Sequence, residues 1–172
     1  SAEEISNTLQ TDLRGTTILL DALAAMEILV KTNERYQVNH ALASYLDERS
    51  EESIIPMLLH SVHIWDRWSD LTHVVRTGKP RNTTVPQDTD KTRYNAFILS
   101  MHVVGRLRAE QIVRALDISA YQNLLDSGGA SGTYTITFLR ANTGMKATLF
   151  DLPRVIPLAE NRIRKEGLAD RV

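Results

Sequence analysis

A glycine-rich bend between a short apolar run and a helix constrains the fold of this chain more than any other feature. Residues 126–132 read Asp-Ser-Gly-Gly-Ala-Ser-Gly and follow the apolar run 123–125. Glycine adopts positive φ without a steric penalty and lets the backbone approach a neighbour or a ligand closely. A helix over 133–141, a strand over 146–150 and a helix over 155–166 are predicted next. This order predicts a β-α-β-α unit, which is the opening of a parallel sheet.

The residues before this unit have a different composition. All five histidines precede residue 103, whereas five of the eight glycines lie at or after Gly128. Ser1 and Glu4 have the spacing of a capping box and predict a helix from the first residues. The other predicted elements are a helix over 16–30, a β-hairpin over 30–38, a helix over 41–46, a long helix over 53–76, a linker over 77–90, and helices over 93–104 and 106–116. Helix, turn, helix and hairpin is the order typical of a winged helix.

Composition and charge exclude several classes of function. The 172 residues are 42% hydrophobic and 24% charged, which is typical of a globular protein. Cysteine is absent, and this excludes disulfide frameworks, thiolate zinc sites and thiol catalysis. There is no run of 18 apolar residues, and the net charge is −1. We therefore expect a cytoplasmic protein with no membrane and no nucleic-acid partner.

The spacing of the glycines favours one class of ligand over another. The dinucleotide pattern Gly-x-Gly-x-x-Gly fails, because Ser127 stands where its first glycine would be. The pattern Asp-x-Gly-x-Gly-x-Gly is met at Asp126, Gly128 and Gly132, with Ala130 in the middle glycine position. An acid at this point repels a pyrophosphate but suits a cationic sulfonium. The alternative is an ordinary turn between a strand and a helix.

A second acid closes the next predicted strand. Asp151 comes 25 residues after Asp126 and directly follows the strand 146–150. A carboxylate in that place can accept hydrogen bonds from both hydroxyls of a ribose. A methyl group at Ala130 is accommodated at little cost if its φ is negative. These residues together predict a site for a nucleoside-like cofactor.

Several segments together resemble the S-adenosylmethionine-dependent small-molecule O-methyltransferases of the plant and bacterial natural-product type. They are 126–134, Phe150-Asp151-Leu152-Pro153, the helix around 20–23 leading to Tyr36, Trp65, Trp68, and Arg76-Thr77-Gly78. The resemblance spans essentially the whole chain. It implies a mixed fold class, in which an α-helical winged-helix dimerisation domain precedes the first β-α-β-α part of a Rossmann-like α/β methyltransferase domain. The implied domains are 1–80, a linker with helices over 81–118, and the cofactor-binding part over 119–172.

The resemblance also implies the roles of individual residues. Those that face S-adenosyl-L-methionine are Asp126, Gly128, Gly129, Gly132, Asp151 and Leu152. Gly128, Gly129 and Gly132 face its methionine end, Asp126 fixes its amino group, and Asp151 with Leu152 holds its ribose. Phe97 and Met101 line the substrate pocket. The implied partners are a second copy of the chain and a small hydroxylated molecule, aromatic or polyketide-like.

The two ends of the chain lead to a further expectation. The predicted winged helix lacks its usual first helix, and the predicted sheet stops after two strands. We therefore expect an internal fragment of a longer protein. The family's catalytic base is a histidine far downstream, so the resemblance assigns no catalytic residue to this chain. On this view the chain binds the cofactor weakly and is inactive by itself.

Other functions remain as alternatives at this stage. A winged helix can bind DNA, but a helix that contacts phosphate needs positive charge, and residues 16–30 contain no Lys or Arg. His60, His63 and His73 are expected to be pocket or interface residues and not metal ligands. Trp65 and Trp68 are expected in the core. A winged-helix ligand-sensing module without catalysis and a pure dimerisation fragment are the remaining alternatives.

Overall fold

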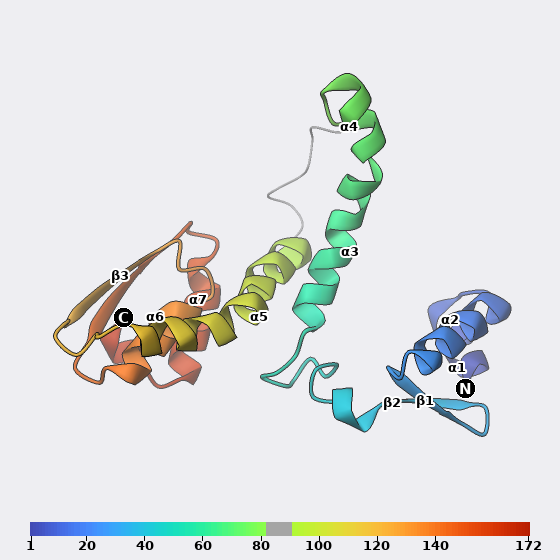
Figure 1. The fold of residues 1–172 in the computed structure, drawn as a ribbon, viewed down its shortest axis with the longest axis horizontal. Coiled ribbons are helices and arrows are strands. Elements are labelled where there is room, and N and C mark those ends of the chain that lie inside the picture. Colours follow the sequence, from blue (N-terminus) through green and yellow to red (C-terminus); the bar gives the residue numbers. More distant parts are fainter. Residues whose placement is uncertain (82–90) are drawn as a thin grey trace. The chain divides into compact units, whose positions relative to one another are not determined.

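A computed structural model describes residues 1–81 and 91–172, with the side chains of residues 66 and 67 left out (Figure 1). The chain divides into two compact units, Ser1–Ile55 and Pro56–Val172. Most of the linker predicted over 77–90 lies outside the described residues.

The first unit combines two helices with a β-hairpin. Its elements are α1 (Ala2–Leu9), α2 (Leu13–Ala25), β1 (Leu29–Thr32), β2 (Arg35–Val38) and the short 3-10 helix η1 (His40–Leu42). The predicted capping box is confirmed, since the Ser1 side chain accepts from the Glu4 amide and Glu4 reaches back to Ser1. The predicted hairpin is also confirmed, with β1 and β2 antiparallel and Leu29 opposite Val38.

One acid ties α2 to the hairpin. Asp21 Oδ1 accepts hydrogen bonds from Tyr36 Oη at 2.7 Å and from Lys31 Nζ at 2.9 Å. These two hydrogen bonds lower the pKa of Asp21 below its ordinary value, and the bond from the Tyr36 hydroxyl has the larger effect. The hairpin is therefore attached to the helix by polar bonds at its surface.

Two predicted helices of this unit have other bounds. The helix predicted over 16–30 begins at Leu13, because the Asp12 side chain accepts the Gly15 amide at 2.7 Å. It ends at Ala25, and Glu27 then has a φ of 60°, which no helix accommodates. The helix predicted over 41–46 is the three-residue turn η1.

The second unit begins with three helices. They are α3 (Ile55–Ser69), α4 (Leu71–Thr77) and α5 (Lys91–Ala115). The prediction of a single helix over 53–76 is therefore wrong, because the helix is interrupted at Asp70, between α3 and α4. The Asp70 carboxylate accepts a hydrogen bond from the Arg81 amide at 2.9 Å.

The two helices predicted over 93–104 and 106–116 are one continuous helix, α5. Gly105 lies inside it, where a Cβ would be 3.6 Å from Tyr134 and 3.8 Å from Thr133 of the next helix. Gly105 therefore faces α6 across an ordinary packing distance and does not end a helix.

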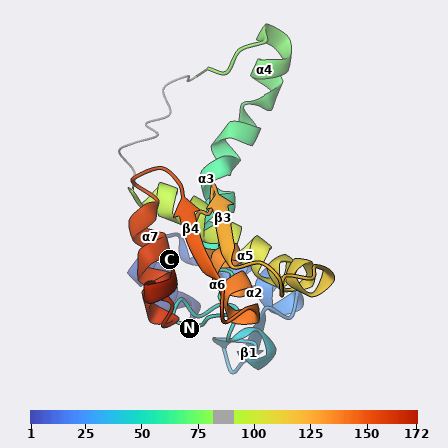
Figure 2. The same ribbon diagram turned by 90° about the vertical axis from the view of Figure 1, so that its left-hand side faces the viewer.

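The rest of the unit is the predicted β-α-β-α arrangement. Its elements are β3 (Asn123–Ser127), α6 (Thr133–Ala141), β4 (Lys146–Phe150), α7 (Ile156–Lys165) and the 3-10 helix η2 (Ala169–Arg171). The strands β3 and β4 lie side by side and are parallel, with Asp126 opposite Leu149 (Figure 2). The pairing confirms the parallel topology, and the bounds of α6 and β4 agree with the prediction.

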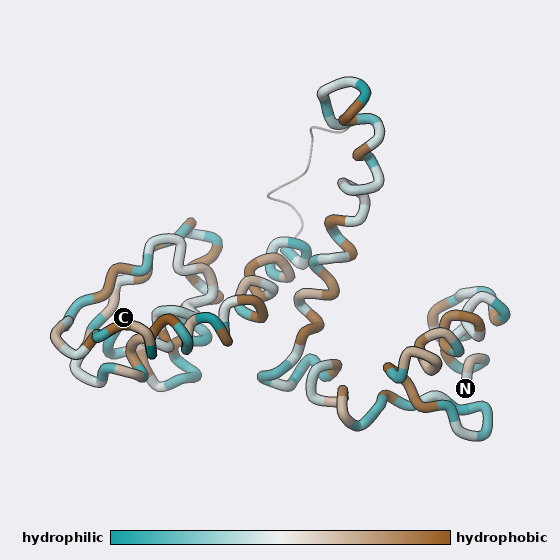
Figure 3. Tube along the Cα trace, in the orientation of Figure 1, coloured by the Kyte–Doolittle hydropathy of each residue, from teal (hydrophilic) through white to brown (hydrophobic). Residues whose placement is uncertain are grey.

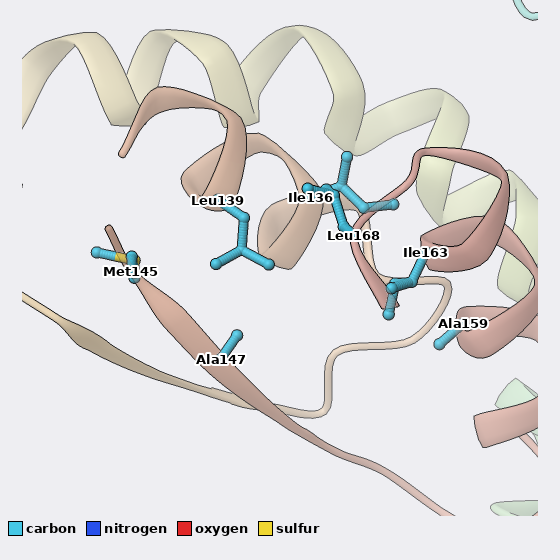
Figure 4. Close-up of a cluster of buried hydrophobic side chains, with 7 residues drawn as sticks. All are labelled: Ile136, Leu139, Met145, Ala147, Ala159, Ile163 and Leu168. Atoms are coloured by element: carbon cyan, nitrogen blue, oxygen red, sulfur yellow. The ribbon is translucent and has the colours of Figure 1, made fainter. Parts of the chain in front are cut away.

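A small hydrophobic core joins α6 and α7 to β4 (Figure 4). Its buried side chains are Ile136, Leu139, Met145, Ala147, Ala159, Ile163 and Leu168. Each large aliphatic side chain buried in this way stabilises the fold by about 1.5–3 kcal/mol. The core fixes α6 and α7 on one face of the strand that ends next to the candidate site.

The residues of this core come from α6 (Ile136 and Leu139), from β4 and the turn before it (Met145 and Ala147), and from α7 and the turn after it (Ala159, Ile163 and Leu168).

The carboxyl end of α6 is held by a single guanidinium. Arg171 Nη2 donates to the Leu139 carbonyl at 2.8 Å, and Nη1 donates to the Thr143 carbonyl at 2.9 Å. Further carbonyls at Asn142 and Met145 lie 3.2 and 3.3 Å from Nη1. A cation at this place is favourable, because the last carbonyls of a helix have no partner within it.

Hydrophobic and hydrophilic residues alternate along the helices (Figure 3). Among the described residues, no helix has the length and apolar character needed to cross a membrane.

Candidate functional site

The loop between β3 and α6 has an unusual backbone. Gly128 and Gly132 each have a φ of 76°, and Ala130 between them has a φ of 49°. The amides of Gly128 and Gly129 both donate to the Phe150 carbonyl, at 2.7 and 3.3 Å. The loop is therefore attached to the last residue of β4, at the carboxyl edge of the two strands.

The three predicted glycines are needed for different reasons. A Cβ on Gly129 would lie 2.6 Å from Leu149 Cγ and 3.1 Å from Asp126 Cγ, so only glycine fits there. Gly132 has positive φ and would bring a Cβ within 3.5 Å of Leu149. Gly128 also has positive φ, but a Cβ there would meet nothing within 4 Å. Gly128 therefore has open space beside it.

Asp126 lies at the base of this loop. Its Oδ2 accepts hydrogen bonds from the Thr135 hydroxyl at 2.6 Å and from the Thr135 amide at 3.2 Å. Thr135 is fully buried in the first turn of α6. A carboxylate at a helix N-terminus is stabilised by the unpaired amides there and by the helix dipole. The structure gives Asp126 this bond, and its contact with an amino group of a ligand stays a prediction.

Asp151 closes the other side of the loop. Its Oδ2 accepts the Ala130 amide at 2.8 Å, and its Oδ1 accepts the Leu152 amide at 2.7 Å. A carboxylate has about four lone-pair positions, so both oxygens can still accept a hydroxyl. Leu152 beside it is 53% exposed. The predicted role of Asp151 and Leu152 at a ribose is compatible with these bonds and stays a prediction.

The backbone at Ala130 does not have the negative φ on which the expectation from the sequence depended. A methyl group there was expected to cost little at negative φ, but its φ is positive. A left-handed conformation costs a non-glycine residue about 1–2 kcal/mol. The bond from the Ala130 amide to Asp151 offsets part of this cost.

His102 is a polar residue of this region to which the sequence assigned no role. Its Nδ1 lies 3.0 Å from Thr133 Oγ1, in the first turn of α6. Burial is the largest cause that lowers its pKa, to about 4, and the positive charges of Arg162 and Arg106 lower it further. The imidazole is therefore neutral at pH 7.

A signal for His102 was present in the sequence. On α5 it lies on the same stripe as the buried residues Ile98, Gly105 and Ala109, which recur at helical spacing. A histidine on such a stripe faces the packed side of a helix. The stripe becomes visible only when 91–115 is recognised as one helix.

The predicted substrate-pocket residues lie on another part of α5. Phe97 is 41% exposed and Met101 is 38% exposed. The Phe97 ring lies 5.2 Å from the His60 ring of α3, at an angle of 53°. Their role in a substrate pocket stays a prediction. Among the described residues, no three His, Cys, Asp or Glu side chains are grouped to hold a metal ion.

Comparison with known proteins decides the family. The model of the O-methyltransferase domain matches residues 68–172, which is more than half of the chain. The chain belongs to the O-methyltransferase family. The resemblance stated from the sequence is thereby confirmed, and S-adenosylmethionine is the cofactor of this family.

Relatives within the family methylate different atoms. The N,N-dimethyltransferase OxyT of Streptomyces rimosus is 27% identical over 181 residues, which cover all of this chain and 53% of OxyT. The tetracenomycin polyketide synthesis 8-O-methyl transferase TcmO of Streptomyces glaucescens is 28% identical over 168 residues, covering 92% of this chain and 49% of TcmO. The chain spans about half the length of these relatives.

Solved structures show the same fold. An O-methyltransferase family protein from Burkholderia thailandensis is 26% identical, with a TM-score of 0.81 over all of this chain and 52% of that protein. The neocarzinostatin O-methyltransferase NcsB1, 23% identical with a TM-score of 0.74 over 99% of this chain and 55% of NcsB1, was solved with S-adenosyl-L-homocysteine and a dihydroxynaphthoic acid. The mixed α/β fold of the O-methyltransferases is therefore the fold of this chain.

The left-handed Ala130 generates a test of the loop. We expect Ala130→Gly to raise the free energy of unfolding by about 0.5–1 kcal/mol, because relief of the steric cost exceeds the added flexibility of the unfolded chain. Urea unfolding measures this change. The control Ala159→Gly, inside α7, should lower the same quantity by about 1 kcal/mol. Equal losses in both variants would contradict the backbone described for the loop.

The neutral His102 generates a test by pH. Its folded-state pKa of about 4 lies below the ordinary 6.5, so between these values only the unfolded chain takes up the proton. The contribution to stability is therefore complete above pH 6.5 and is lost as the pH falls toward 4. We expect His102→Asn to flatten this slope in urea unfolding between pH 4.5 and 7. The control His73→Asn, on α4, should keep the slope, and an unchanged slope in His102→Asn would disprove the assignment.

Proposed function

We propose that this chain binds S-adenosylmethionine at the loop 128–132 and supplies the cofactor-holding part of an O-methyltransferase. The observation that carries the proposal is the pair of carboxylates, Asp126 and Asp151, at the ends of neighbouring parallel strands, with the open Gly128 between them. Ligands of α/β sheets bind at the carboxyl ends of the strands. The family match favours this enzyme over a ligand-sensing module without catalysis.

The proposed roles follow the polarity of the cofactor. Gly128, Gly129 and Gly132 face the methionine end, where the backbone can approach closely. Asp126 stabilises the α-amino group by charge, and a carboxylate there is favoured by the positive ligand. Asp151 accepts the ribose hydroxyls, and the exposed Leu152 packs against the nucleoside.

The chemistry requires the acceptor to lie in line with the methyl group. S-adenosylmethionine supplies an electrophilic methyl on its sulfonium, and an acceptor hydroxyl loses its proton to a base. Holding the two reactants in line is the contribution of the binding residues. We assign no catalytic base to the described residues.

The proposed acceptor is a small hydroxylated molecule, aromatic or polyketide-like. TcmO acts in tetracenomycin polyketide synthesis, and a relative from Streptomyces sahachiroi is a 3-hydroxy-5-methyl-1-naphthoate 3-O-methyltransferase. We propose that Phe97 and Met101 line the pocket for this molecule. Both are partly exposed and lie one helical turn apart on α5, so they offer an apolar surface to a flat ring.

Residues 1–80, which include the whole first unit, are proposed to be a winged-helix dimerisation domain. The elements of the first unit are two helices and an antiparallel hairpin in the order expected of a winged helix. Leu9, Leu13, Ile18, Leu19 and Met26 are large apolar residues that are 48–67% exposed in the single chain. A second copy of the chain would cover such a surface.

The cofactor proposal is tested by calorimetry with S-adenosylhomocysteine. We expect the chain to bind it and to ignore NAD, and Asp151→Asn to weaken binding by about 1–3 kcal/mol, because charge-assisted hydrogen bonds to the ribose are lost. Asp170→Asn removes an exposed acid of the same charge and is the control. Binding of NAD instead of S-adenosylhomocysteine would end this proposal, and full binding by Asp151→Asn would remove Asp151 from the site.

The proposed dimer is tested by sedimentation. We expect a dimer at micromolar concentration and a monomer for Leu19→Glu, since a charge on the apolar face of α2 must lose its water in the interface. Leu107→Glu changes a leucine of α5 that is also mostly exposed and should leave the dimer intact. A monomeric wild type, or a dimer that survives Leu19→Glu, would contradict the interface.

A further inference from the structure

A half-buried arginine on α7 lies behind the loop. Arg162 Nη1 donates to the Ser131 carbonyl at 3.0 Å, to Ser131 Oγ at 3.1 Å and to Thr133 Oγ1 at 3.2 Å. Ser131 is 1% exposed and Thr133 is 8% exposed. The guanidinium therefore bonds the loop through two buried residues.

The hydrogen positions in this cluster follow from its chemistry. A guanidinium is only a donor, so the approach of Arg162 Nη2 to His102 Nε2, at 3.4 Å, requires that Nε2 be unprotonated. The imidazole proton is then on Nδ1 and is donated to Thr133 Oγ1, at 3.0 Å. A protonated His102 would face the guanidinium with like charge. The neutral histidine and the arginine are therefore compatible only in this one arrangement.

The loop conformation depends on bonds from outside the loop. Ser131 lies between Ala130 and Gly132, which both have positive φ. Gly128, Gly129 and Ala130 are bonded to the end of β4 through Phe150 and Asp151. Ser131 is the loop residue whose carbonyl and hydroxyl are both bonded to α7, through Arg162.

We propose that Arg162 is a positioning residue, which holds the loop 128–132 in the conformation that receives the cofactor. This inference rests on the proposed function for the ligand itself. Arg162 does not touch the cofactor in this proposal and acts through Ser131 and Thr133. A loop that is already in its bound conformation binds without a further loss of conformational freedom. Loss of the guanidinium releases Ser131 and leaves its buried carbonyl with fewer partners.

The test uses the full chain and three variants. Arg162→Met removes the donors but keeps much of the side-chain volume, and Arg162→Lys keeps the charge without the planar fork. Arg164→Met removes the same charge from an exposed position of the same helix and is the control. S-adenosylhomocysteine is the probe in calorimetry. Hydrogen exchange of the peptides that cover 128–134 and 156–165 is measured without ligand.

We expect Arg162→Met to weaken S-adenosylhomocysteine binding at least tenfold and to speed exchange in 128–134 at least tenfold, with 156–165 still protected. Arg162→Lys should recover part of both effects, and Arg164→Met should resemble the wild type. Unchanged exchange in 128–134, or an equal increase in both peptides, would overturn the positioning role. If the wild type fails to bind S-adenosylhomocysteine, the proposed function fails, and the exchange measurement alone decides the role of Arg162.

Discussion

The attachment of a strained loop to the end of β4 is the constraint on which the candidate site depends. The Phe150 carbonyl accepts two loop amides, and the Asp151 carboxylate accepts a third, from Ala130. Ala130 has a φ of 49°, a conformation that a non-glycine residue keeps only where the surrounding structure holds it. The parallel pairing of β3 with β4 places these acceptors beside the loop, so the site exists only because the two strands are neighbours.

The fold around the site could be predicted from local signals. The bounds of α6 and β4 agree with the sequence, because the apolar runs there are short and have a clear turn at each end. The spacing of the loop glycines also predicted a bend between β3 and α6, and the structure has it there. The contacts of these glycines and of Asp126 and Asp151 with a cofactor stay a prediction. The parallel pairing followed from the order of elements, since a helix between two strands returns the chain for a parallel strand and sequential strands are usually neighbours.

Other features depend on contacts that one-dimensional patterns do not contain. Gly105 resembles a helix end in the sequence, but it lies in the middle of α5, where it faces Thr133 and Tyr134 of α6. Asp70 divides a helix that reads as continuous. The Ala130 amide is held by Asp151, directly after β4, and the burial of His102 depends on how α5 packs against α6. In each case a tertiary neighbour overrides a local preference.

The polar cluster behind the loop shows how packing and binding are joined in this fold. Arg162 on α7, His102 on α5 and Thr133 on α6 bond one another, and Arg162 bonds the loop through Ser131. Donors and acceptors match only when the histidine is neutral, and burial together with two arginines keeps its pKa low. Three helices therefore determine one loop conformation. The glycines permit that conformation, while Asp151 on the strand side and Arg162 on the helix side select it from the many that glycine allows.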